Sequence, residues 1–201
     1  MSRYAVIDFE TTGMSPELGA RPTEVAIVMV EDGRVVDRYQ SLMNAGAFVP
    51  YEIQALTGIT NAMVRAAPDA AVVMREAAAF VGGQPLVAHN AAFDSKFWGA
   101  ELRRLGLRAG GDFVCSLLLA RRLVPEAPNH KLGTLVSTLG LPVTGRYHRA
   151  LADAEATANL FVHLGETLKT RYRLPAVSCE LLLALQRTPR TQLERCVARF
   201  R

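Results

Sequence analysis

Apolar runs and helical patterns follow one another along the chain in a definite order. Residues 3–8 form a short apolar run with β-branched members, and residues 23–43 predict two strands joined at Asp32-Gly33, a strong hairpin signal. From residue 51 to residue 80 the pattern becomes helical and rich in alanine. The chain therefore opens with three strands and continues with helices.

Strands and helices alternate in the next part of the chain. The predicted elements are a buried strand at 85–89, a helix capped by Asn90, a strand and helix over 112–123, a helix over 131–139 and a longer helix from Ala150. Alternation after an initial meander predicts an α/β domain with a mixed, roughly five-stranded sheet flanked by helices.

The length and composition are those of one folded domain. The 201 residues suffice for one core, and 50% of them are hydrophobic, which argues against extended disorder. We assign residues 1–168 to the main domain and residues 169–201 to a linker and a helical appendage that begins at a capping box, Thr191 to Glu194. For the appendage, packing on its own domain is favoured over docking to a partner.

Other classes of protein are disfavoured by the same sequence. No window reaches the ~20 apolar residues of a membrane span and no signal peptide is recognised, so we expect a cytoplasmic protein. The three cysteines form no CxxC pair that would indicate zinc. Residues 1–100 carry 7 basic and 11 acidic side chains, and residues 101–201 carry 16 and 8. An acidic half joined to a basic half suits a cation-dependent enzyme acting on a phosphate polymer, although surface solubility alone could produce it.

Acidic side chains follow the ends of three predicted elements. Asp8 and Glu10 end the first strand and project from one face of it, because side chains alternate. Asp94 lies in the first turn of the helix after the strand at 85–89, and Asp153 lies on a helical stripe with apolar residues, five positions after His148. Each acid has an ordinary explanation alone, but together they form an oxygen-rich set of the kind that Mg²⁺ and Mn²⁺ prefer.

The three segments DFETTG, HNAAFD and HRALADA resemble, in order and wording, the three motifs of the DEDDh exonuclease family. This DnaQ-like family includes the proofreading epsilon subunit of bacterial DNA polymerase III. The resemblance covers roughly residues 3–165. It implies a ribonuclease H-like three-layer fold and hydrolysis from the 3′ end of nucleic acid, with release of nucleoside 5′-monophosphates.

The resemblance also implies roles for particular residues. Asp8, Glu10, Asp94 and Asp153 would hold two divalent ions, Mg²⁺ or Mn²⁺, and His148 would be the general base, since histidine can accept a proton near neutral pH. The weaker assignments to substrate contact are Thr11, Thr57, Ile59 and Phe93, and Arg146 and Arg149 are candidates for neutralising phosphates.

Three functions remain open at this stage. The first is an exonuclease on single-stranded DNA ends, either free-standing or in a proofreading or repair assembly with a DNA polymerase subunit. The second is an exoribonuclease that trims RNA, because discrimination of the 2′-hydroxyl depends on pocket contacts. The third is a catalytically inactive scaffold that binds nucleic acid or a polymerase, which the intact set of five residues disfavours.

Overall fold

A hairpin and its neighbouring strand form the first half of the sheet. The computed structural model describes residues 3–142, 145 and 148–201. β2 (Pro22–Glu31) and β3 (Arg34–Leu42) are joined at Asp32 and Gly33, which both have positive φ, as a two-residue turn of this kind requires. β1 (Tyr4–Thr11) pairs with β2 antiparallel, so the predicted meander is confirmed.

The sheet becomes parallel on the other side of β1. β4 (Leu86–Ala88) pairs parallel with β1, and β5 (Phe113–Cys115) pairs parallel with β4. The five strands lie in the order β3-β2-β1-β4-β5. The prediction of a mixed five-stranded sheet is therefore correct.

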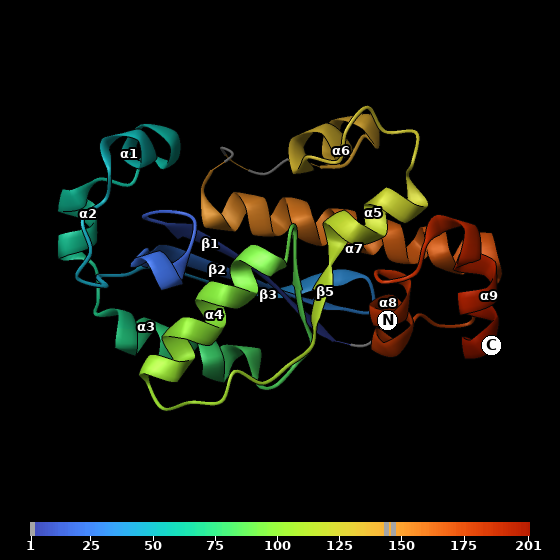
Figure 1. The fold of residues 1–201 in the computed structure, drawn as a ribbon, viewed down its shortest axis with the longest axis horizontal. Helices are drawn as coiled ribbons and strands as arrows, with labels where there is room; N and C mark the ends of the chain where they lie inside the picture. The colour runs from blue at the N-terminus through green and yellow to red at the C-terminus, as the bar shows by residue number, and fades with distance from the viewer. Residues whose placement is uncertain (1–2, 143–144, 146–147) are drawn as a thin grey trace.

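Helices cover both faces of this sheet (Figure 1). One face packs against α7 (Ala150–Tyr172), and the other packs against α3 (Ala70–Val81) and α4 (Ala92–Arg104). The remaining elements are η1 (Pro16–Leu18), α1 (Tyr51–Thr57), α2 (Asn61–Ala66), α5 (Ser116–Leu123), α6 (Leu132–Thr138), α8 (Cys179–Leu185), η2 (Arg190–Gln192), α9 (Leu193–Val197) and η3 (Ala198–Phe200). This arrangement is the predicted three-layer fold. Within the described part of the chain, none of the helices has the length and apolar character needed to cross a membrane.

The alternation of β1 divides its side chains between the two cores. Tyr4 and Val6 lie in the core under α7, whereas Ala5 and Ile7 lie in the core under α3 and α4. Continuing the same alternation places Asp8 on the α7 side, at the carboxyl end of the strand. Small residues at four-residue spacing, Ala150, Ala154 and Ala158, are fully buried and let α7 lie close to the sheet there.

The C-terminal helices pack on the α7 core. Leu181, Leu185 and Val197 from α8 and α9 are buried in the same cluster as Tyr4. The side chain of Gln186 accepts the N–H of Cys115 at 2.7 Å and donates to the carbonyl of Phe113, so it bonds to the outer edge of β5 as a further strand would. The predicted boundary at residue 168 falls inside α7, and the division into domain and appendage stays a prediction.

Two predicted helix caps are wrong. Asn90 does not cap α4: it adopts a left-handed conformation with φ of 70°, and the helix starts after Ala91 without a side-chain cap. Thr191 lies inside η2 instead of capping α9, because the chain enters this short helix through a 3-10 turn that supplies its own backbone bonds.

Candidate active site

The three motif segments, distant in sequence, line one cleft. Asp8 and Glu10 come from the end of β1, Asp94 from α4, His148 from the segment just before α7, and Asp153 from the first turn of α7. The carboxyl end of β1, the first turn of α4 and the first turn of α7 meet at this edge of the sheet. All five residues singled out by the motifs are therefore brought together.

A hydrogen bond from Phe9 on β1 to Asp94 on α4 links these two elements. The carboxylate of Asp94 accepts the backbone N–H of Phe9 at 3.2 Å, and this side chain is only 2% exposed. Burial raises the pKa of Asp94 to about 8, although hydrogen bonds from the backbone N–H groups of Asp94 itself and of Phe9 oppose the shift. The carboxylate is thus placed where a proton or a cation must offset its charge.

Asp153 orders the segment that carries His148. One oxygen of its carboxylate accepts the backbone N–H of His148 at 2.8 Å, and His148 has a φ of 62°, which a histidine adopts rarely. The imidazole remains exposed to solvent. Ligand atoms of Glu10, His148 and Asp153 all lie within 4.8 Å of one another, a spacing that could hold a metal ion.

The four motif carboxylates repel one another strongly. Burial, followed by the charges of Asp94, Asp153, Glu10 and Glu24, raises the pKa of Asp8 well above its ordinary value. Burial and the charge of Asp153 raise the pKa of Glu10 to about 7, and burial raises that of Asp153. Clustered oxygen ligands with raised pKa values are a donor set that fits hard divalent cations.

Stability of the metal-free protein is expected to fall as the pH rises. The folded-state pKa values of Glu10 and Asp94, about 7 and about 8, exceed their unfolded values, so the folded state keeps protons that the unfolded state has lost. Their contribution to stability is complete below about pH 4 and is lost as the pH rises through about 7 to 8. Thermal unfolding in EDTA at pH 6.0 and 8.5 should show the lower melting temperature at pH 8.5.

Added Mn²⁺ should reverse this trend, because it binds the deprotonated carboxylates. The rise in melting temperature on adding Mn²⁺ should therefore be larger at pH 8.5 than at pH 6.0. Asp94→Asn serves as the control, since it removes one of the titrating groups and should flatten the pH dependence in EDTA. Equal melting temperatures for the metal-free wild type at both pH values would contradict the assigned repulsion.

The predicted substrate contacts divide into three groups. Thr11, Thr57 and Phe93 line the cleft, and the ring of Phe93 packs 4.9 Å from that of Phe97. Ile59 does not line it, since its side chain is fully buried in a small apolar cluster at the base of α1 and α2. Arg146 lies outside the residues that the structure describes.

Arg149, the other arginine predicted to meet phosphate, is bonded within the protein. Its guanidinium donates to both carboxylate oxygens of Glu24, at 2.8 and 3.1 Å. Glu24 is fully buried in β2 and stands opposite Glu10 in the strand pairing. The phosphate contact of Arg149 stays a prediction.

Three further cleft residues, Met14, Ile53 and His89, had not been predicted from the sequence. Met14, Ile53 and Leu56 are apolar side chains in the lining of the cleft, which we call the apolar wall, and Met14 is 78% exposed. His89 also lines the cleft, where its Nε2–H donates to the carbonyl of His130 and its Nδ1 pairs with the hydroxyl of Ser116. The apolar wall gives no sequence signal, because isolated surface hydrophobics are common.

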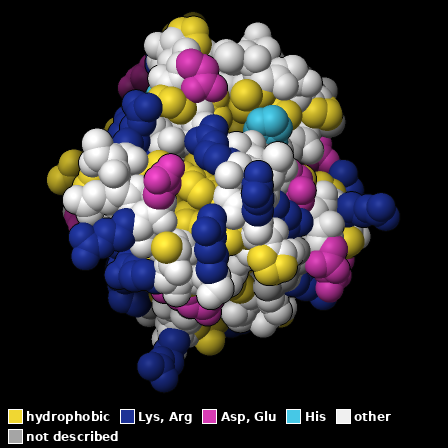
Figure 2. All heavy atoms as spheres, turned by 90° about the vertical axis from the view of Figure 1, so that its right-hand side faces the viewer, with side chains coloured by type: hydrophobic (Ala, Val, Ile, Leu, Met, Phe, Trp, Pro, Cys, Tyr) yellow, Lys and Arg dark blue, Asp and Glu magenta, His cyan; other side chains and the backbone are white. Residues whose placement is uncertain are grey.

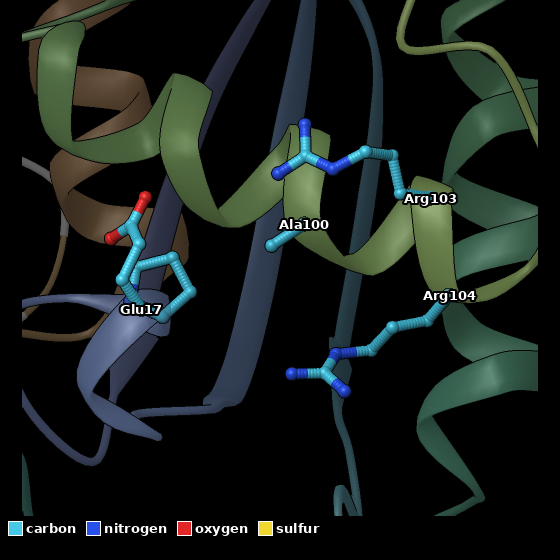
Figure 3. A pocket seen from close by; sticks show the side chains of 5 residues that line it. Glu17, Ala100, Arg103 and Arg104 are labelled. Atoms are coloured by element: carbon cyan, nitrogen blue, oxygen red, sulfur yellow. The ribbon is translucent and has the colours of Figure 1, made fainter.

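A separate hollow lies between η1 and α4. Figure 3 shows the side chains of Arg103 and Arg104 on α4 extending to either side of Ala100, with Glu17 on the far side of the hollow. Arg104 also lies 3.6 Å from Glu101, which is already paired with Arg21. None of these side chains lines the cleft that holds the motif acids.

The excess of basic side chains in the second half of the sequence has a location in the fold. Figure 2 shows Lys and Arg side chains prominent over the end of the molecule formed by α8 and α9. Arg187, Arg190 and Arg195 are exposed in this part of the chain. The acid cluster lies at the other end of α7, a helix of 23 residues, or about 34 Å.

Comparisons with known proteins agree with the geometry of the cleft. The exonuclease family of the RNase T type matches residues 5–161. The DNA polymerase III subunit epsilon of Aquifex aeolicus is 34% identical over 84% of this chain and 83% of its own length. A PolC-type DNA polymerase III of Oceanobacillus iheyensis is 39% identical over 82% of this chain, but the chain spans only 12% of that relative.

A solved structure of Exonuclease X in complex with 5′ overhanging duplex DNA is also similar. It is 28% identical, has a TM-score of 0.73, and the match covers 91% of this chain and 99% of that one. Enzymes of the exonuclease family depend on metal ions, which agrees with the acidic group at Glu10, His148 and Asp153. The resemblance predicted from the three motifs is confirmed, and the chain belongs to the exonuclease family, in its DnaQ-like group.

Proposed function

We propose that this protein is a metal-dependent 3′-to-5′ exonuclease that removes nucleotides from single-stranded DNA ends. The observation that carries the proposal is the placement of Asp8, Glu10, Asp94, His148 and Asp153 around one cleft, in the order and number that the DEDDh motifs require. The likeness to Exonuclease X, solved with DNA, and to an epsilon subunit supports DNA as the substrate class and a role in proofreading or repair.

Asp8, Glu10, Asp94 and Asp153 would hold two divalent cations, Mg²⁺ or Mn²⁺. Asp8 would be the central ligand of this set, and the charges of the other three acids all raise its pKa. When bound, the cations stabilise the negative charge that develops on the attacking and leaving oxygens. The four carboxylates fix the position of that charge relative to the strand end, and the fold places them there before substrate arrives.

His148 would take the proton from the attacking water. His148 is exposed and lines the cleft, and the hydrogen bond from its backbone N–H to Asp153 fixes the chain next to the acids. The water oxygen attacks the phosphorus, the bond from phosphorus to the 3′ oxygen breaks, and that oxygen gains a proton from solvent. A nucleoside 5′-monophosphate and a shortened strand with a free 3′ hydroxyl result.

The apolar part of the cleft lining suits a terminal base and sugar. Met14, Ile53, Leu56 and Phe93 offer apolar surface on which a base of any sequence can lie. Thr11 and Thr57 line the same cleft, and the hydroxyl of Thr57 donates to the carbonyl of Ile53 and accepts the N–H of Ile59. Such contacts favour recognition of an end without a fixed sequence.

The proposed reaction is tested by digesting 5′-labelled single-stranded DNA and a matched RNA with Mg²⁺, Mn²⁺ or EDTA. A metal-dependent ladder that shortens from the 3′ end is expected on DNA, and the variant Asp8→Ala controls for contaminating nucleases. Preferred digestion of RNA would replace the DNA assignment with an exoribonuclease. Absence of cleavage on both polymers would leave a binding or scaffolding protein.

A further inference from the structure

Glu24 holds together three elements beside the acid cluster. Its carboxylate accepts the side-chain amide of Gln40 on β3 at 2.7 Å, both guanidinium donors of Arg149, and the backbone N–H of Ala150 at 3.1 Å. Arg149 and Ala150 are the residue before α7 and its first residue. One buried carboxylate in β2 therefore fixes the start of the helix that carries Asp153.

Stability alone does not explain a charge at this position. Ala26 and Val28, the next residues on the same face of β2, are apolar and fully buried under α7. The side chain of Glu24 is buried, whereas that of Arg149 is 35% exposed. An ion pair with a buried member is weak evidence for stability, because removing the charge from water costs much of what the pairing gains. Glu24 also lies opposite Glu10 in the strand pairing, where its charge adds to the repulsion among the acids.

His148 and Asp153 are connected to the pair of Glu24 and Arg149 through the start of α7. His148 directly precedes Arg149, and its backbone N–H is bonded to Asp153 one turn into α7. Because Arg149 is tied to β2 by two hydrogen bonds, the segment from His148 to Asp153 has a fixed place relative to Glu10 on the adjacent strand β1. Glu10, His148 and Asp153 are the three residues whose ligand atoms lie within 4.8 Å of one another.

We propose that Glu24 and Arg149 are a positioning pair for the nuclease reaction, which fixes His148 and Asp153 relative to Glu10 without contacting the substrate. The inference rests on the proposed function for its kinetic consequences. It also gives Arg149 a role other than phosphate binding, and the two roles differ in the kinetic constant that they affect. Loss of a positioning residue lowers kcat and metal affinity, whereas loss of a phosphate contact raises KM and weakens its salt dependence.

The test uses the full chain with the variants Glu24→Gln, Arg149→Gln, Arg149→Lys and the double variant Glu24→Gln/Arg149→Gln. Arg195→Gln on α9 is the matched control, because it removes one exposed arginine far from the cleft. The measurements are kcat and KM on single-stranded DNA at several salt concentrations, and Mn²⁺ affinity by calorimetry. Mn²⁺ affinity reports on the pair independently of turnover.

Both single glutamine variants are expected to lower kcat and Mn²⁺ affinity by roughly 10- to 100-fold, with KM and its salt dependence unchanged. Arg149→Lys should recover part of the loss, since it keeps the charge, and the double variant should lose no more than the worse single variant. Arg149→Gln is expected to fold, because its side chain is 35% exposed.

Two results would overturn the inference. One is a raised KM with a weaker salt dependence and an unchanged kcat in Arg149→Gln, which would make Arg149 a phosphate contact. The other is unchanged Mn²⁺ affinity in both Glu24→Gln and Arg149→Gln. A wild-type protein without nuclease activity would contradict the proposed function instead, and the Mn²⁺ affinities would still decide whether the pair organises the cluster.

Discussion

Replacing Asp8 with asparagine is expected to reduce turnover by roughly a thousandfold or more and, at the same time, to raise the melting temperature of the metal-free protein. A metal ion supplies several kcal/mol of transition-state stabilisation, and a loss of about 4 kcal/mol corresponds to about three orders of magnitude in rate. Asp8 is the acid on which the charges of all the others act, so its loss should affect the whole site.

The opposite effect on stability follows from the same electrostatics. Burial and four neighbouring carboxylates raise the pKa of Asp8, which means that its charged form is disfavoured in the fold. Asparagine keeps the size of the side chain and removes the charge. At pH 8 in EDTA, where most of the neighbouring acids have lost their protons, the variant should melt at a higher temperature, by roughly 2 to 4 °C for each kcal/mol of repulsion removed.

Asp112→Asn provides the matched control, because Asp112 is an exposed aspartate outside the cleft. It should change neither the turnover nor the melting temperature. The wild type should gain stability when Mn²⁺ is added, and Asp8→Asn should gain much less. If Asp8→Asn retained wild-type turnover, or melted below the wild type in EDTA, the central position assigned to Asp8 would be wrong.

The motif residues could be predicted because each lies close to the end of an element with a strong local pattern. Alternation in β1 places Asp8 and Glu10 on one face, and the start of a helix places Asp94 and Asp153 in first turns. The hairpin at Asp32-Gly33 fixes the order of the first strands. These features depend on local sequence, so the main elements of the fold follow from it. The five residues were singled out because their three segments resemble the DEDDh motifs in order and wording.

Glu24 could not be predicted in the same way. A strand of this length predicts a buried face, but the partner of an acid on that face, Arg149, lies 125 residues away. Glu24 becomes recognisable only from the register of β1 and β2, which places it opposite Glu10. Ile59 is the converse case: it lies two residues after Thr57, which lines the cleft, yet its own side chain points into a core that only the tertiary packing defines.

Removing the imidazole of His148 is expected to reduce kcat by roughly 10²- to 10⁴-fold, the range that general bases contribute, with little change in KM. The carboxylates would remain in place, so Mn²⁺ should still raise the melting temperature of His148→Ala. The alternative is that His148 is itself a ligand, since its ring lies within reach of Glu10 and Asp153. In that case the variant would lose Mn²⁺ affinity together with activity.

The backbone at His148 calls for a second variant. Its φ of 62° is a conformation that asparagine adopts more readily than alanine, so His148→Asn removes the base with less strain on the loop. His163→Ala, which changes a histidine in the middle of α7, is the control and should keep full activity. Added imidazole should restore part of the turnover of His148→Ala, because a small base can enter the space left by the ring. Near-normal kcat in both His148→Ala and His148→Asn would show that the proton leaves by another route.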